Sequence, residues 1–502
     1  MDLPIFWICA VTFAILGYFW VKKKYSFWER HGFVYVKPTF PLGNAWGVGW
    51  KKHNSEFFQD LYREMKGKDV IGGMYFLTSP SAVVLDLDFL KTMLIKDFQY
   101  FHDRGLYINE RDDPLSGNLF ALRGQKWKVM RGKLSPTFTS GKMKMMHSTI
   151  IGVALEFQKA LEPHAQRGEE IELKDFLSRF TTDVIGNCAF GIECNSLKDP
   201  DTEFRRIGRK IFDFPPLGML KAIFMTIFPE AARTLRLKFN SDTITNFFMN
   251  LLRDTIDYRE KNNVKRNDFL SLMIQLKNTG KLEGDNTDLG KLTFEELAAQ
   301  TFVFFGAGFE TSSSTMAYTL YELALNQDIQ DRVREEVNRV LEKHGGEYTY
   351  EACMELKYLE RVIQETLRKY PVVDNLIRLV TNDYQLPGSD RVIKKGVGIA
   401  IPVYAIHRDP EIYPNPERFD PDRFTEENIQ NRHPMAYLPF GEGPRMCIGM
   451  RFALMQTRVG LATLLNKYRV QVTQKTPVPM TLAPSNAFLS PVGGMWLRIE
   501  KI

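Results

Sequence analysis

Apolar positions along the chain recur mostly with the 3.6-residue period of helices, and alternating, strand-like runs are few. The segment 278–291, rich in Gly, Asn and Asp, leads directly into a long helical pattern and is interpreted as a surface loop. No fixed-period repeat or low-complexity tract interrupts the pattern. The sequence therefore predicts one large, mainly α domain with minor β sheets. Strands are expected at 70–77, 82–87 and 397–403, and in C-terminal hairpins near 470–473 and 495–499.

The N-terminus carries an uncharged run, residues 3–21, which Lys22, Lys23 and Lys24 follow at once. A helix of that length spans about 29 Å, close to the ~30 Å hydrocarbon core of a bilayer. A cleavable signal peptide is the alternative, but Asp2 precedes the run and no small-x-small site follows it. Because positive charge stays on the cytoplasmic side, the following chain is expected in the cytosol. The predicted organisation is an anchor at 1–21, a proline-containing connector at 22–44 and a globular domain at 45–502.

The longest helical pattern begins with a predicted capping box at Thr293 and Glu296 and continues to Leu325. Its interior, residues 302–312, is apolar on every side. A helix that is apolar all round must be buried, so we expect it to pass through the core of the domain.

Three residues inside this helix are costly there. Gly306 and Gly308 each cost about 1 kcal/mol relative to alanine, and the Glu310 carboxylate costs more unless it has a partner. One interpretation is a glycine kink for close packing, with a buried acid bonded to a hydroxyl. The other is that the glycines let a flat group lie against the backbone while Glu310 and Thr311 handle protons.

Composition excludes several classes of protein. The 502 residues are 44% hydrophobic and 25% charged, with 35 Gly, 25 Pro and 5 Cys, which is unlike disordered, collagen-like or disulfide-framework chains. The net charge of +6 is too small and diffuse to indicate nucleic acid binding. The odd cysteine count, without C-x-x-C or zinc spacing, indicates a reducing compartment.

The strongest local signal is the segment 440–449, Phe-Gly-Glu-Gly-Pro-Arg-Met-Cys-Ile-Gly. Its glycines and proline predict a tight loop. Cys447 stands just before an amphipathic helix, whose free N–H groups favour the thiolate, the form that ligates metals. Gly449 leaves room for a planar group. Taken alone, a single cysteine is more often inert packing.

Two pairs of residues at helical spacing indicate a functional site only when they are considered together with the segment 440–449. Glu365 and Arg368, three apart on a helix, can pair on one face, a pattern that is most often an exposed ion pair. Trp127 and Arg131, four apart, place an indole N–H and a guanidinium on one face.

Segment 440–449 resembles the haem-thiolate loop F-x-x-G-x-R-x-C-x-G of the cytochrome P450 monooxygenases at every fixed position. Four further segments resemble family motifs in the family's order: W-x-x-x-R at 127–131, A-G-x-[DE]-T at 307–311, E-x-x-R at 365–368 and P-E-R-F at 416–419. The resemblance covers essentially the whole chain and is nearest to the insect microsomal branch that oxidises plant toxins and insecticides. It implies a single P450-like haem-thiolate catalytic domain at 45–502, behind an N-terminal transmembrane helix.

The resemblance implies haem b as cofactor, with Cys447 as the axial ligand to its iron. It also implies that Glu365, Arg368 and Arg418 lock the core behind the cysteine loop. The implied catalytic residues are Thr311 and Glu310, which relay protons. The implied cofactor-binding residues are Cys447, Arg445, Trp127, Arg131, Arg378, Arg104, Phe440, Gly441, Gly449 and Ala307. The implied substrate pocket contains Phe120, Phe212, Phe305, Phe309, Leu376 and Phe488, with Phe214 beside Phe212.

The implied reaction inserts one oxygen atom from O2 into a lipophilic substrate, either a xenobiotic or an endogenous lipid or hormone. Electrons come from NADPH through a separate NADPH-cytochrome reductase, and cytochrome b5 is a second candidate partner. The implied location is the endoplasmic reticulum membrane, with the catalytic domain facing the cytosol. A basic face would steer an acidic reductase, although such charge runs are as often solvated surface; it comprises Lys126, Lys128, Lys133, Lys142 and Lys144.

Two other functions are compatible with a haem-thiolate loop. One is an isomerase or dehydratase that rearranges a peroxide without O2 or reductase. Such branches tend to depart from the acid–Thr pair, which Glu310 and Thr311 retain here. The other is a non-catalytic haem sensor or electron carrier, but no segment resembles a signalling output domain.

Overall fold

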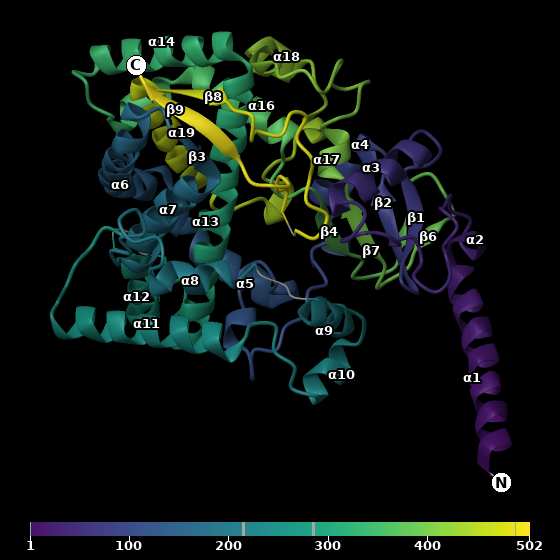
Figure 1. Cartoon of the computed structure of the whole chain (residues 1–502). Helices are drawn as coiled ribbons and strands as arrows, with labels where there is room; N and C mark the ends of the chain where they lie inside the picture. The colour runs from purple at the N-terminus through teal and green to yellow at the C-terminus, as the bar shows by residue number, and fades with distance from the viewer. Residues whose placement is uncertain (1, 213–215, 284–286, 487) are drawn as a thin grey trace.

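The computed structural model describes residues 2–212, 216–283, 287–486 and 488–502. A large helical part is joined to a smaller β-rich part, as the sequence pattern predicts (Figure 1). The N-terminal and central helices are α1 (Asp2–Tyr25), α2 (Phe27–Arg30), α3 (Asn54–Met65), α4 (Leu87–Lys91), α5 (Gly124–Leu134), α6 (Ser140–Gln166), α7 (Leu173–Ile185), α8 (Glu203–Arg209), α9 (Pro216–Ile227), α10 (Pro229–Thr234) and α11 (Asp242–Lys261). The later helices are α12 (Phe269–Thr279), α13 (Phe294–Leu325), α14 (Gln327–Lys343), α15 (Tyr350–Glu355), α16 (Lys357–Lys369), α17 (Val403–Ile406), α18 (Glu426–Gln430) and α19 (Met450–Lys467).

The strands form three small sheets. In the largest, the order is β1-β2-β7-β4, with β2 and β7 parallel and the other pairs antiparallel. The second is antiparallel with the order β3-β9-β8, and the third is the pair β5 and β6. Their bounds are β1 (Ile71–Phe76), β2 (Ser79–Val84), β3 (Glu170–Glu172), β4 (Leu376–Leu379), β5 (Tyr384–Gln385), β6 (Val392–Ile393), β7 (Gly398–Ile401), β8 (Tyr468–Val472) and β9 (Trp496–Lys501).

Each expected strand overlaps an observed one, although β2 covers 79–84 and not 82–87, and the C-terminal pairing differs from the prediction. β8 and β9 pair with each other across a long connection instead of forming separate hairpins. The sequence pattern also missed β4, because this strand has only 4 residues and includes the buried charge of Arg378.

The long central helix α13 is the axis of the helical part (Figure 1). Its predicted capping box is confirmed: the Thr293 hydroxyl accepts from the Glu296 N–H at 3.1 Å, and the Glu296 carboxylate accepts from the Thr293 N–H at 3.0 Å. Most of its side chains are buried on all sides, as the apolar pattern predicts. Helices α7 and α19 pack against it.

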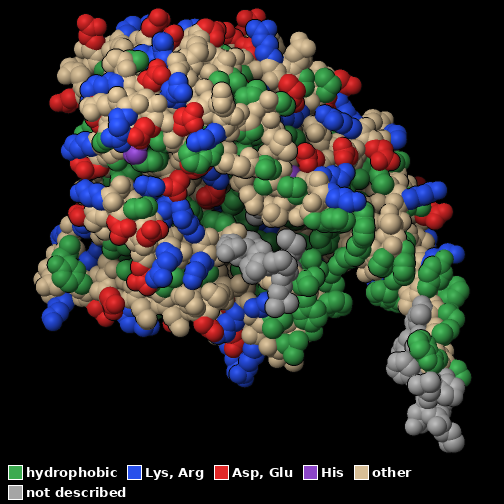
Figure 2. Space-filling model, in the orientation of Figure 1, with side chains coloured by type: hydrophobic (Ala, Val, Ile, Leu, Met, Phe, Trp, Pro, Cys, Tyr) green, Lys and Arg blue, Asp and Glu red, His purple; other side chains and the backbone are tan. Residues whose placement is uncertain are grey.

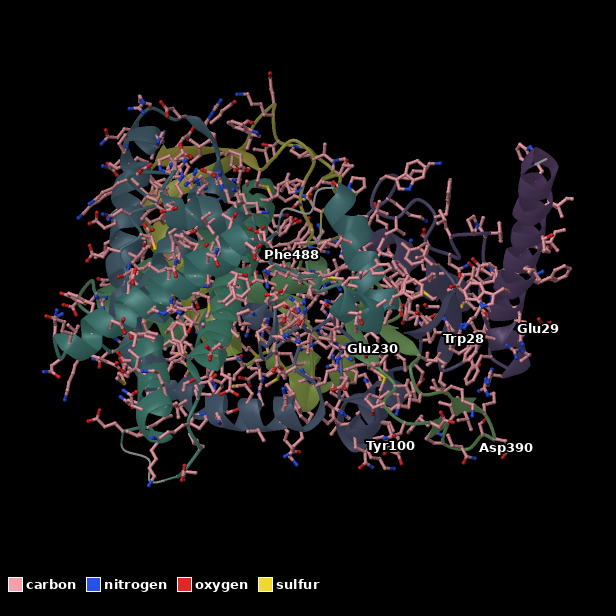
Figure 3. The ribbon with its side chains drawn as sticks, turned by 90° about the horizontal axis from the view of Figure 1, so that it is seen from below. Trp28, Glu29, Tyr100, Glu230, Asp390 and Phe488 are labelled. Atoms are coloured by element: carbon pink, nitrogen blue, oxygen red, sulfur yellow. The ribbon has the colours of Figure 1, made fainter. Side chains whose placement is uncertain are left out.

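A second core lies under the β1-β2-β7-β4 sheet and includes the connector predicted at 22–44. Trp28 is fully buried there, and its indole N–H donates to the Met74 carbonyl at 2.9 Å. Figure 3 shows Trp28 at the foot of α1. The segment before the sheet is therefore folded onto the domain.

Helix α1 projects away from the rest of the molecule (Figure 1). Its last turns contact the domain, since the Tyr18 ring lies 5.9 Å from the Phe40 ring and the Tyr25 hydroxyl donates to the Pro41 carbonyl at 3.0 Å. Within the part of the chain that the structure describes, no helix reaches the length and apolarity needed to cross a membrane. The anchor predicted at 1–21 includes Met1, which is outside the described residues.

Candidate active site

The segment 440–449 forms the tight loop that its glycines and proline predict. The Phe440 carbonyl accepts from the Cys447 N–H at 2.9 Å, and the Gly443 carbonyl accepts from the Met446 N–H at 2.9 Å. Gly443 has φ +73°, and a Cβ there would lie 2.2 Å from the Leu94 carbonyl oxygen, so only glycine fits. The loop closes before α19, which places Cys447 near the N-terminus of that helix.

Cys447 differs from the other cysteines that the structure describes. Cys188, Cys194 and Cys353 are buried, whereas the Cys447 side chain is accessible. Burial of the thiol nevertheless raises its pKa, whereas the hydrogen bond from the Gly449 N–H and the positive charge of Arg131 lower it. The sulfur therefore faces open space within the protein, next to groups that favour the thiolate.

A buried ion pair lies behind the loop. Glu365 and Arg368 are both fully buried, and their carboxylate and guanidinium groups make two hydrogen bonds of 2.7 and 2.8 Å. They are thus not an exposed pair. The arginine that joins them is Arg423, whose Nε lies 3.4 Å from Glu365 Oε1.

The expected role of Arg418 in this cluster is therefore wrong. Arg418 is exposed, and it contributes only its carbonyl, which accepts from Arg368 Nη2 at 3.4 Å. Because Glu365 Oε1 also accepts from the Asp420 N–H at 2.9 Å, the chain turns so that the next Pro-x-Arg-Phe segment, 421–424, reaches the carboxylate.

His407 is a supporting residue that the sequence did not reveal. Its Nε2 accepts from the Leu438 N–H at 2.8 Å, just before the cysteine loop, and its carbonyl accepts from Arg368 Nη1 at 3.0 Å. Burial lowers the pKa of His407 to about 3, so the ring is neutral and suited to accept. A single histidine in a loop has no pattern that would have predicted this role.

Four arginines gather beside Cys447: Arg104, Arg131, Arg378 and Arg445. Burial lowers the pKa of Arg445 to about 9, with the positive charge of Arg378 acting in the same direction, and burial lowers the pKa of Arg378 to about 10. Among the described residues their one ion-pair partner is Asp103, 3.6 Å from Arg445 Nη2. The buried Nε of Arg378 has no hydrogen-bond partner among the residues that the structure describes. The cluster therefore carries more positive charge than the protein neutralises.

Hydrogen bonds fix these arginines between the cysteine loop and the segments before it. Arg445 donates to the carbonyls of His102 at 2.8 Å and Leu122 at 2.7 Å, and its guanidinium lies 4.1 Å from the centre of the Trp127 ring. Arg131, from α5, donates to the Met446 carbonyl at 2.9 Å. Arg104 donates to the Phe120 carbonyl at 2.9 Å and lies over its half-exposed ring.

The surroundings of the α13 segment 306–311 decide between the two interpretations of Gly308. A Cβ on Gly308 would lie 2.9 Å from the Ile185 side chain of α7, so this glycine serves close helix packing and not a flat ligand. The accessible position is Ala307, which stands between the buried Gly306 and the partly buried Gly308. Thr311, one turn later, donates from its hydroxyl to the Ala307 carbonyl at 2.5 Å. Gln456 of α19 donates to the Gly308 carbonyl at 3.0 Å and so joins the cysteine helix to α13.

Glu310 has two partners. Its Oε1 lies 2.8 Å from the Lys174 ammonium and accepts from the Ser314 hydroxyl at 3.3 Å. The hydroxyl partner agrees with the packing interpretation of this acid, whereas no sequence signal predicted the lysine.

The predicted pocket residues divide into two groups. Phe212 contacts both Phe488 and Phe309, with ring centres 5.3 and 6.2 Å apart. Phe305 is fully buried and packs against Phe204 and other core aromatics, with Phe309 stacked on it. Phe214 lies outside the described residues.

Leu376 reaches the cysteine loop, since its Cδ1 would be 3.4 Å from a Cβ on Gly441. Figure 2 shows a hollow near the middle of the molecule. Figure 3 shows Phe488 near the centre of the molecule.

These residues fit a flat, anionic cofactor with a metal at its centre. Cys447 offers a sulfur ligand, Ala307 is accessible in mid-helix, and no atom lies within 4 Å of a Cβ built on Gly449. The unneutralised arginines suit carboxylate groups at the cofactor edge. A haem with a thiolate ligand has this combination, and a haem-thiolate protein is the class that the fold and site fit.

Comparison with known proteins agrees. The sequence model of the cytochrome P450 family matches residues 36–498. The chain is 48% identical to Probable cytochrome P450 6a14 of Drosophila melanogaster, over 96% of each chain. It is 47% identical to Cytochrome P450 6a2 of the same fly, over the whole of both chains. It is 45% identical to Cytochrome P450 6A1 of Musca domestica, over 100% of this chain and 99% of that one.

The chain therefore belongs to the cytochrome P450 family. It is an oxidoreductase, a haem b-dependent monooxygenase, and its relatives are insect enzymes.

Proposed function

We propose that Cys447 is the axial ligand of the haem iron and that the surrounding residues support oxidation of lipophilic substrates. The observation that carries this proposal is the accessible Cys447 thiol, held by a loop whose other groups are tied by backbone hydrogen bonds. When bound, the thiolate-ligated haem supplies the activation of O2 from which one oxygen atom enters the substrate.

The arginine cluster holds the haem carboxylates. Charge-assisted guanidinium–carboxylate hydrogen bonds are strong and directional, and Arg378 has a buried donor available for one. Trp127 fixes Arg445 by lying against its guanidinium. Phe440, Gly441, Gly449 and Ala307 bound the flat faces of the cofactor.

Thr311 and Glu310 supply protons to the oxygen side of the site. The Thr311 hydroxyl lies next to the accessible Ala307, and Glu310 adds an ionisable group in the same turn of α13. In the Thr311→Ala variant, NADPH consumption should yield hydrogen peroxide in place of product. Unchanged coupling between NADPH use and product would contradict the relay.

The substrates are lipophilic xenobiotics, such as plant toxins or insecticides, and an endogenous lipid or hormone is the alternative. The aromatic contacts among Phe212, Phe309 and Phe488 favour bulky or planar molecules. Phe120, Phe305 and Leu376 complete the proposed pocket. A screen of substrate-induced haem spectra across lipophilic compounds, with turnover assays in the presence of reductase, distinguishes the two classes.

Electrons arrive from an NADPH-cytochrome reductase, with cytochrome b5 as a second donor, at the lysines around α5. Lys128 is exposed, whereas Lys126 is paired with Glu110 at 2.8 Å and Lys133 donates to the Lys291 carbonyl at 2.7 Å. Exposed charges steer a partner most strongly at low salt. Charge reversal at Lys126 and Lys128 should slow reduction several-fold at low salt and less at high salt. An unchanged reduction rate would exclude this face.

The enzyme is attached to the endoplasmic reticulum membrane by residues 1–21, with residues 45–502 in the cytosol. Phe40, Trp46 and Trp50 are exposed, and Phe40 contacts α1. Tryptophan side chains favour the membrane interface. Helices α9 and α10 lie on the side toward which α1 projects (Figure 1); Leu220 of α9 and Phe228, between the two helices, are exposed. Protease access to a C-terminal tag in intact vesicles tests this orientation; a protected tag would contradict it.

The carbon monoxide adduct of the reduced protein tests the central assignment. The full chain should show the absorption that is characteristic of thiolate ligation. Cys447→Ser should lose it, and the matched control Cys353→Ala, which removes a buried thiol from α15, should retain it. A thiolate-type adduct in the Cys447 variant would overturn the proposal.

A further inference from the structure

The carboxylate of Glu310 is held by a residue outside α13. Lys174, the second residue of α7, places its ammonium 2.8 Å from Glu310 Oε1, and the two side chains are 20% and 16% exposed. The same oxygen accepts from the Ser314 hydroxyl at 3.3 Å. A charge pair this far from solvent is strongly orienting, because separating the partners would leave each one poorly solvated.

The same ammonium also contacts the C-terminal segment that carries Phe488. Lys174 Nζ donates to the Ser490 hydroxyl at 3.4 Å. Ser490 follows Phe488 by two residues, and its carbonyl accepts from the Ala483 N–H at 2.8 Å, which closes the segment into a loop. One lysine thus joins α13, α7 and this loop.

A second route connects the same two places through aromatic rings. The Phe488 ring lies 5.3 Å from the Phe212 ring, which in turn lies 6.2 Å from the ring of Phe309, the residue before Glu310. Contacts therefore lead from Phe488 to the Glu310 turn by two paths, one through rings and one through the Lys174 ammonium. Figure 3 shows Phe488 near the centre of the molecule.

We propose that Lys174 is a positioning residue that links the substrate-contacting segment at Phe488 to the orientation of the Glu310 carboxylate. This inference rests on the proposed roles of Glu310 and Phe488. A substrate that displaces the Phe488 ring moves Ser490, and the shared ammonium transmits the movement to Glu310. Proton supply at α13 is thereby adjusted to the occupancy of the pocket, without a proton leaving Lys174.

Backbone hydrogen–deuterium exchange of the haem-loaded full chain tests the link without a turnover measurement. Lys174→Met should speed exchange roughly tenfold in both 306–314 and 483–492, the change expected for a loss of about 1.4 kcal/mol of local stability. Lys174→Arg should restore most of the protection. Unchanged exchange at 483–492 in Lys174→Met would overturn the proposal.

Lys369→Met is the matched control. Lys369 also makes an ion pair with α13, 2.8 Å from Glu322, and is likewise mostly buried. Its removal should affect the C-terminal part of α13 and leave 483–492 unchanged. An equal effect of both variants on 483–492 would show general loosening of the fold and would refute a specific link.

The Phe488→Ala substitution disturbs the Phe488 segment in the way that a bound substrate would, without the need for a ligand. In the wild-type background it should speed exchange at 306–314, and part of that effect should disappear in the Lys174→Met background, because the ammonium no longer transmits it. Fully additive effects would overturn the proposal. Failure of the proposed function would be separate, because the thiolate spectrum of Cys447 does not depend on Lys174.

Discussion

Two groups of buried or partly buried arginines contact the segments around Cys447, and they differ in how their charge is neutralised. Arg368 and Arg423 share the carboxylate of Glu365, which is itself fully buried. Arg104, Arg131, Arg378 and Arg445 have only Asp103 among the described residues, at 3.6 Å from one of them. The chain itself neutralises the charge of the first group, whereas the second group keeps guanidinium N–H donors that could bind an external anion.

This difference distinguishes arginines that stabilise the backbone from arginines that bind an external anion. A buried charge that the protein neutralises itself fixes the backbone that carries it. A buried group of like charges costs stability unless an external anion completes it. Burial and residue type alone would not distinguish the two groups, because each contains both buried and partly buried arginines. The distinguishing observation is whether a carboxylate of the chain lies within ion-pair distance of each arginine, which among the four is true of Arg445 alone in the described residues.

The largest effect is expected when the neutralised group loses its carboxylate. Glu365→Gln leaves two arginines buried without a counter-charge and should lower the free energy of unfolding by about 3–5 kcal/mol. Denaturant unfolding with and without haem measures this, and both forms should lose similar amounts. An effect confined to the haem-loaded form would place Glu365 in the binding group.

Arg423 and Arg418 provide the matched pair for the same cluster. Arg423→Met should be destabilising, whereas Arg418→Met, which changes an exposed side chain, should stay within about 0.5 kcal/mol of wild type. The reverse ranking would restore the assignment made from the sequence.

A smaller effect, with a change of sign, is expected in the other group. Arg378→Met removes an unneutralised buried charge, so the haem-free protein should gain about 1–2 kcal/mol of stability. The same variant should release haem to an acceptor protein more readily, with roughly 10–100-fold weaker retention, because a charge-assisted hydrogen bond is lost. Destabilisation of both forms would mean that Arg378 is structural.

The smallest effect is expected for Asp374. It is a buried carboxylate without a neutralising partner, the opposite charge to that of the unneutralised arginines. Burial raises the pKa of Asp374 to about 7, and its Oδ2 has no hydrogen-bond partner in the described part of the chain. An acid with a raised folded-state pKa stabilises the fold at low pH and loses this contribution as pH rises from about 4 to 7. Asp374→Asn should flatten that decline, a change on the order of 1–2 kcal/mol between pH 6 and pH 8.

The nearby groups define the control for this titration. His53 lies 3.8 Å from Asp374 Oδ2, and burial lowers the pKa of His53, so it supplies little positive charge near neutral pH. Asp383→Asn, an exposed carboxylate paired with Lys394 at 2.8 Å, should leave the pH dependence of unfolding unchanged. Equal slopes for both variants would exclude Asp374 as the source.

The sequence predicted those parts of the fold that depend on local patterns. The capping box at Thr293, the path of α13 through the core and the tight loop before α19 all follow from residue spacing. The family resemblance added the order of the motifs and the haem.

Contacts between distant segments could not be predicted in this way. The choice of Arg423 over Arg418 depends on how the chain turns after Asp420, and both segments contain the same Pro-x-Arg-Phe spacing. The role of Gly308 depends on Ile185 of another helix. Lys174 and His407 carry no motif, and each acts through a partner far away in the chain.

The pairing of β2 with β7 has a consequence for how the molecule is made. Ser81 meets Gly398, a residue that the ribosome adds about 300 positions later. At typical synthesis speeds the first hairpin must wait tens of seconds for its neighbour, with one edge open. Such delayed closure slows folding and invites aggregation. Yield in a recombinant host should therefore improve with added chaperones that cover the open edge.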